Sequence, residues 1–66
     1  MTIQEFRQEM ATLAFVAKKR KGFEVFDVSR HGVELFCVTY AELHPLTDVH
    51  QLLAKKLRPE YMPPLG

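Results

Sequence analysis

The chain has 66 residues, and its nine lysines and arginines nearly balance its eight aspartates and glutamates, for a formal net charge of +1. This length allows one domain at most, and so small a domain usually needs disulfides, a metal or oligomerisation to supplement its core. The single cysteine excludes an internal disulfide, and no Cys/His spacing predicts a zinc site, so oligomerisation remains. The balanced charge excludes a global field that would attract nucleic acid or an acidic membrane.

Residues 1–5 do not form a basic region followed by an apolar stretch, so no signal peptide is visible. The longest apolar run is far shorter than a membrane span. Together with a lone thiol, these patterns predict a cytoplasmic protein that does not contact membranes.

The first helix is expected at about residues 3–20. Thr2 and Glu5 have the spacing of a capping box, in which each side chain satisfies a free amide at the helix start. Apolar residues then recur at helical spacing and form one stripe: Ile3, Phe6, Met10, Leu13, Ala14 and Ala17. Four consecutive cations at 18–21 suit the negative end of the helix dipole, and Gly22 suits a left-handed stop.

A β-hairpin is expected next, with strands at 23–28 and 33–40. A three-residue loop at 30–32, with glycine in the left-handed third position, would join the strands, and a two-residue loop at 31–32 is the alternative. Both faces of this hairpin are apolar, since one side of the second strand carries Val33, Leu35 and Cys37 and the other carries Phe36, Val38 and Tyr40. So short a chain cannot easily cover both faces, and we expect a second copy or a partner to cover one of them.

A second helix follows a connection that contains Pro45. Either Asp48, in a capping box with Gln51, or Thr47 begins it. Its apolar stripe is formed by Val49, Leu52, Leu53 and Leu57. Pro59 ends the helix. We expect the proline-containing tail, residues 59–66, to dock onto a partner, to fold back over apolar surface or to be frayed.

These elements predict an α+β fold with one helix–hairpin–helix (αββα) domain at residues 1–58. Its two-stranded antiparallel sheet could be extended by dimerisation. The element order and size over residues 2–58 resemble the small head–tail joining proteins of lambda-like phages. The likeness is one of architecture, and no function is carried over from it.

The aromatic face of the hairpin is the predicted partner-binding surface. It consists of Phe26, Val28, Phe36, Val38 and Tyr40. Phe15 is a second candidate, because helical spacing places it opposite the apolar stripe, facing away from the core. Aromatic residues are enriched in interface centres. The alternative is that both helices cover this face and that it is simply the internal core.

The basic run of Lys18, Lys19, Arg20 and Lys21 is a candidate contact for nucleic acid, because consecutive cations neutralise phosphates. The more common role of such a run is a solvated helix end matched to its dipole. No recognition-helix motif, RNA-binding signature or finger spacing accompanies it.

No catalytic site is predicted. The histidines, at 31, 44 and 50, lack ligand spacing, and Cys37 is expected to be a small buried hydrophobe. With three glycines the chain has no phosphate-binding loop. We therefore expect a non-enzymatic protein–protein interaction module (an adaptor, inhibitor or regulatory subunit) that needs no cofactor or metal and forms a homodimer through the hairpin. The alternative is a dimeric nucleic-acid-binding protein that uses the basic run.

Overall fold

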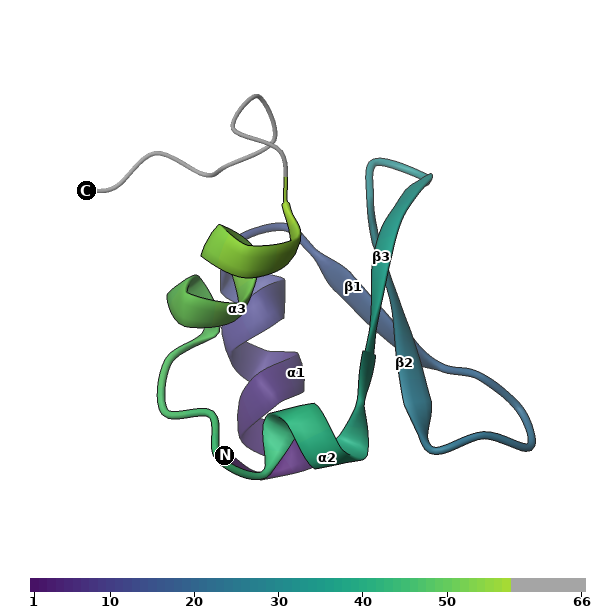
Figure 1. Cartoon of the computed structure of the whole chain (residues 1–66). Helices are drawn as coiled ribbons and strands as arrows, with labels where there is room; N and C mark the ends of the chain where they lie inside the picture. Colours follow the sequence, from purple (N-terminus) through teal and green to yellow (C-terminus); the bar gives the residue numbers. More distant parts are fainter. Residues whose placement is uncertain (58–66) are drawn as a thin grey trace.

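The structure, a computed structural model, describes residues 1–57, which form three helices and three strands (Figure 1). In chain order these are α1 (Ile3–Thr12), β1 (Val16–Lys19), β2 (Val25–Arg30), β3 (Val33–Thr39), α2 (Tyr40–Leu43) and α3 (Val49–Lys56). The strands form one antiparallel sheet in the order β1-β2-β3, and the helices gather on one side of it (Figure 1). The α+β class and the hairpin are confirmed, whereas the two-stranded αββα arrangement is wrong because β1 adds a third strand.

The start of α1 follows the sequence closely. The Glu5 amide donates to Thr2 Oγ1 at 3.1 Å, and the Thr2 amide donates to Glu5 Oε1 at 3.0 Å. The predicted capping box is therefore confirmed. The hydrogen bond from the Thr2 amide lowers the pKa of the Glu5 carboxyl.

The end of α1 differs from the prediction, because the helix stops at Thr12 instead of continuing to residue 20. Ala14 adopts a left-handed φ of 66°, its amide donates to the Ala11 carbonyl at 3.0 Å, and the Phe15 amide donates to the Met10 carbonyl at 2.9 Å. These two bonds make a Schellman motif with alanine where glycine is usual. The motif turns Phe15 inward, so that Phe15 and Met10 are both buried in the core.

Because the helix ends early, the basic run lies in β1 and the turn after it. β1 pairs with β2 in a register that places Ala17 opposite Val28 and Lys19 opposite Phe26. Gly22 has a φ of 85° within the turn, so its left-handed conformation serves the β1–β2 connection rather than a helix end.

The β2–β3 hairpin has the two-residue loop that the sequence left open. Arg30 pairs with Val33, and both loop residues, His31 and Gly32, have positive φ, as a type I′ turn requires. The register shifts between the pairs that involve Val28 and Ser29, so that Leu35 has no cross-strand partner. This β-bulge turns Leu35 against the core cluster, away from the face predicted for it.

The core lies between the helices and one face of the sheet. Its buried residues are Phe6, Met10, Phe15, Phe26, Val28, Val38, Leu43, Val49, Leu52, Leu53 and Leu57. The Phe6 and Phe26 rings are 5.7 Å apart, and the Phe26 and Tyr40 rings are stacked at 5.4 Å. Tyr40 begins α2 instead of ending a strand, because Thr39 and Glu42 form a second capping box at that point.

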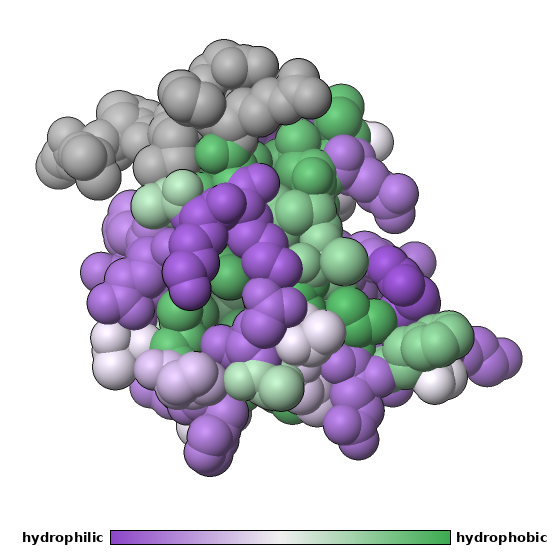
Figure 2. Space-filling view, viewed as in Figure 1, coloured by the Kyte–Doolittle hydropathy of each residue, from purple (hydrophilic) through white to green (hydrophobic). Residues whose placement is uncertain are grey.

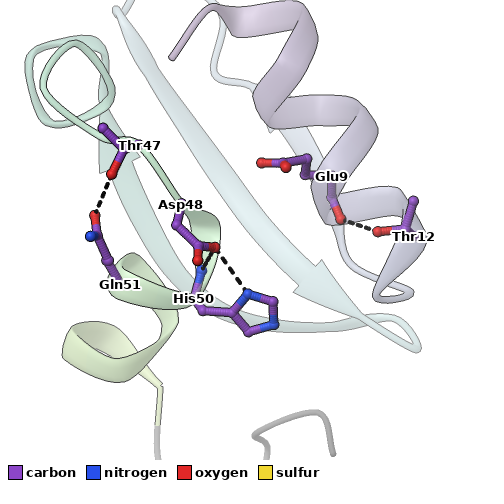
Figure 3. A network of polar contacts seen from close by, with 6 residues as sticks. All are labelled: Glu9, Thr12, Thr47, Asp48, His50 and Gln51. Atoms are coloured by element: carbon purple, nitrogen blue, oxygen red, sulfur yellow. Dashed lines mark hydrogen bonds and ion pairs between the residues drawn. The ribbon is translucent and has the colours of Figure 1, made fainter. Parts of the chain in front are cut away.

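Asp48 is the N-cap of α3, in agreement with one of the two starts predicted for this helix. Its Oδ1 accepts from the His50 amide at 2.9 Å and contacts the His50 ring at 3.0 Å (Figure 3). Gln51 does not complete a capping box, since its side-chain oxygen accepts from the Thr47 hydroxyl (Figure 3). The predictions for Pro59 and for the tail at 59–66 lie outside the described residues.

Candidate functional site

The outer face of the sheet is mostly polar, which corrects the prediction of two apolar faces. Phe26 and Val38 pair across β2 and β3 on the buried face, so their neighbours Lys18, Asp27 and Cys37 lie on the other. Lys18 and Cys37 are exposed, and Asp27 is half-buried. The prediction that Cys37 is buried is therefore wrong, because the helices cover only the opposite face of the sheet.

Four of the predicted partner-binding residues belong to the core of the single chain. Phe15 is 2% exposed and Phe26 1%, while Val28 and Val38 are fully buried. The other two, Phe36 and Tyr40, are half-buried and pack against the same core. The alternative interpretation, an internal core, thus describes this face, and Phe15 does not face outward. The homodimer stays a prediction, but the open apolar face on which that prediction was based is absent from the part of the chain that the structure describes.

The exposed charge gathers instead on the segment 16–24, which we call the basic arm. The arm contains β1 and the β1–β2 turn, and the turn projects away from the helices at the lower right of Figure 1. It holds four cations and one carboxylate, an excess of three positive charges. The rest of the described chain holds four cations and six carboxylates, a deficit of two. The overall charge of +1 therefore conceals a strongly asymmetric distribution.

One cation of the arm is fixed by an ion pair. The Arg20 guanidinium donates to both carboxylate oxygens of Asp27, with Nε at 3.1 Å from Oδ2. This bidentate hydrogen bonding raises the pKa of Arg20 and lowers the pKa of Asp27. Arg20 also lies 6.0 Å from the centre of the Phe23 ring. The ion pair thus anchors the guanidinium next to an aromatic side chain of the turn.

Phe23 is the most exposed large apolar side chain in the described chain, at 61%, and Val16 at the other end of the arm is 59% exposed. Figure 2 shows apolar and charged surface side by side at the corner that this turn occupies. Lys18, Lys19 and Lys21 are exposed, and they make no ion pair among residues 1–57. The arm therefore combines free cations with apolar surface. The exposure of Phe23 was not expected from the sequence, because the predicted strand at 23–28 included that residue.

The opposite edge of the sheet, on β3, is partly occupied by the chain itself. Lys56 Nζ, from α3, donates to the Cys37 carbonyl on β3 at 2.9 Å and lies 2.7 Å from Glu42 Oε2. The hydrogen bond from Lys56 is the main reason why the pKa of Glu42 is lowered. This contact ties α3 to β3 and occupies a backbone acceptor at that edge.

Residues suited to catalysis or metal binding do not converge. His31 lies in the hairpin loop, His44 ends α2, and His50 lies in α3. Within residues 1–57, no group of three or more histidine, cysteine, aspartate or glutamate side chains could hold a metal ion. No helix in that range is long and apolar enough to cross a membrane.

One hollow of the described surface lies between α3 and the loop before it. It measures about 590 Å³ and is lined by Glu42, Pro45, Leu46, Gln51, Leu52 and Lys55. Its acidic residue, Glu42, is already engaged by Lys56, and no nucleophile lines it. This hollow therefore does not present a recognisable chemical site.

Comparison with protein-family models, with curated proteins and with solved structures gives no match to this chain. Function must therefore be argued from the arm's own geometry.

Proposed function

We propose that this chain is a small non-enzymatic binding module that recognises an acidic segment of a partner protein through the basic arm. The observation that carries the proposal is the concentration of free lysines beside the exposed Phe23 on one projecting segment. Such a module would serve as an adaptor, an inhibitor or a regulatory subunit.

Charge complementarity supports an acidic partner. Lys18, Lys19 and Lys21 have no carboxylate partner within the described chain, so an incoming carboxylate need not displace an existing ion pair. The remainder of the described chain is net negative, which orients an acidic partner toward the arm rather than to other surfaces. Exposed apolar groups, Phe23 and Val16, would add contact area that salt does not screen.

The second candidate function is binding of single-stranded nucleic acid through the same arm. Phe23 favours it, since exposed aromatic side chains beside cations stack with unpaired bases. The arm's small charge excess favours the protein partner, because nucleic-acid affinity depends on neutralising several phosphates at once.

Titrations followed by NMR test the proposal and separate its two versions. The probes are a blocked peptide that alternates glutamate with threonine and a single-stranded oligothymidylate. We expect the peptide to shift resonances of the arm and the double variant Lys18→Gln/Lys21→Gln to weaken binding several-fold. Lys55→Gln, which removes an exposed lysine outside the arm, is the matched control and should leave affinity unchanged.

Stronger binding of the oligonucleotide, with a steep loss as salt rises, would favour the second candidate. Equal losses in the double variant and in Lys55→Gln would show that the arm has no special role.

A further inference from the structure

We propose that the acidic partner segment binds by adding a fourth strand along the free edge of β1. This inference rests on the proposed function and specifies its geometry. Strand addition is a general mode of peptide recognition in which backbone hydrogen bonds supply affinity and neighbouring side chains supply selectivity.

The direction of the backbone groups in β1 follows from its pairing with β2. In an antiparallel pair, residues that exchange hydrogen bonds alternate with residues that do not. The Arg20 amide donates to the Val25 carbonyl at 2.9 Å, so Lys18 and Asp27, two residues along each strand, form the next bonded pair. Lys19, which lies between them, therefore directs its N–H and C=O away from β2.

Ala17, two residues before Lys19, likewise directs its N–H and C=O away from β2. Neither Ala17 nor Lys19 makes a further hydrogen bond among residues 1–57, so two amides and two carbonyls are available at this edge. β1 has a strand neighbour on one side only. Lys19 is exposed and Ala17 half-buried, and an extended segment that runs beside them would bond to both.

The β3 edge shows that this alternation predicts backbone direction correctly. The Tyr40 amide donates to the Glu24 carbonyl at 3.1 Å, so alternation directs the Cys37 carbonyl outward. That carbonyl is the one that Lys56 binds. The structure thus covers an outward group on β3 and leaves the equivalent groups on β1 open.

The lysines decide which strand can occupy the β1 edge. In a second copy paired antiparallel through the outward residues Ala17 and Lys19, Lys18 would face Lys18 of that copy, and like charges directly opposite each other destabilise a sheet. An acidic strand instead places carboxylates beside Lys18, on the outer face of the sheet. Its alternate side chains lie on the other face, beside the half-buried Ala17, where a threonine or valine would pack. The preferred occupant is therefore an extended segment of another protein in which acidic and β-branched residues alternate.

Backbone methylation of the probe separates strand addition from simple charge attraction. The glutamate–threonine peptide is compared with the same peptide N-methylated at its threonines, which retains every charge but lacks the N–H groups that would face Ala17 and Lys19. We expect N-methylation to weaken binding about tenfold. Amide exchange at Ala17 and Lys19 should slow when the unmethylated peptide binds. Lys18, whose amide faces β2, is the internal control.

A variant pair tests the same edge from the side of the protein. Lys19→Pro removes an outward N–H without removing a bond to β2, and Lys19→Thr removes the same charge but keeps the N–H. We expect the proline variant to bind about tenfold more weakly than the threonine variant. The peptide comparison on the unmodified chain remains decisive if the proline variant does not fold.

The outcomes distinguish this inference from the proposed function. Equal binding of the two peptides would overturn strand addition while leaving recognition by the basic arm intact. No binding of either peptide, with no effect of the arm variants, would overturn both and would assign the edge lysines to preventing aggregation alone.

Discussion

Lys56 Nζ lies 2.9 Å from the Cys37 carbonyl oxygen, so a side chain of the last described helix occupies an outward acceptor on the β3 edge of the sheet. The same ammonium lies 2.7 Å from Glu42 Oε2, and Glu42 also completes the capping box of α2. One lysine thereby connects α3, α2 and β3. The two edges of this small sheet therefore differ, because the chain itself binds an outward carbonyl on β3 and no such contact is made to β1 within residues 1–57.

Replacing Lys56 by methionine should lower the free energy of unfolding by roughly 1 kcal/mol, because it leaves the Cys37 carbonyl and Glu42 without their charged partner. Chemical denaturation measures this change. Lys55→Met is the matched control, since Lys55 is exposed, and it should stay within about 0.5 kcal/mol of the unmodified chain. Equal effects of the two substitutions would show that the Lys56 contact is not stabilising.

The parts of the fold that local chemistry determines were predictable from the sequence. The Thr2–Glu5 capping box, the Asp48 cap and the apolar stripe of α3 depend on residues a few positions apart, and all three are present. The end of α1 was not predictable in this way. Ala14 carries no sequence signal for a left-handed conformation. Burial of Phe15 in the core offsets the steric cost of that conformation, and this burial depends on residues far away in the sequence.

The candidate site was mislocated for the same reason. An unbroken first helix would have left the sheet with two strands. In the structure the helices cover the face that carries Phe26 and Val38, so both are core residues, and the pairing of β1 places Lys18 and Lys19 on an edge strand. The sequence identified the basic residues as a candidate surface, but their backbone direction depends on pairing with β2, which is a long-range feature.

Ala14→Gly should stabilise the chain by roughly 0.5–1 kcal/mol, since glycine adopts a positive φ without the steric penalty that alanine carries at 66°. Thermal unfolding measures the increase. Ala11→Gly makes the same chemical change within α1, where it should destabilise by up to about 1 kcal/mol. Opposite changes in stability at the two positions would establish the Schellman motif. A loss of stability at both positions would contradict it.

Stability should fall in acid because of the caps and ion pairs. The pKa of Asp48 is lowered by hydrogen bonds from the His50 amide and ring, and the pKa of Glu42 is lowered by Lys56 (Figure 3 shows the Asp48 contacts). A carboxyl whose pKa is lower in the folded state binds fewer protons there, so its contribution is complete above the unfolded-state pKa of about 4 and disappears as pH falls through the folded-state value.

Asp48→Asn tests this dependence, because asparagine still caps a helix but does not ionise. We expect the variant to retain most of its stability at neutral pH and to lose less than the unmodified chain does between about pH 5 and pH 2. Denaturant midpoints measured across that range provide the comparison. Parallel pH profiles for the two proteins would show that Asp48 ionisation does not contribute.

Phe15 and Phe23 make the sharpest contrast between the core and the proposed site. Phe15 is 2% exposed and Phe23 is 61% exposed. Phe15→Ala removes a ring that packs in the core, and we expect it to lower the free energy of unfolding by about 3–5 kcal/mol. This loss is comparable to the whole stability of a domain this small, so the variant should be largely unfolded by circular dichroism.

Phe23→Ala should stay within about 0.5 kcal/mol of the unmodified chain and remain fully folded. Phe23→Ala should also weaken binding of the acidic peptide, because it removes apolar surface from the basic arm. A folded Phe15→Ala variant would contradict the inward turn at Ala14, and undiminished peptide binding by Phe23→Ala would remove Phe23 from the proposed contact.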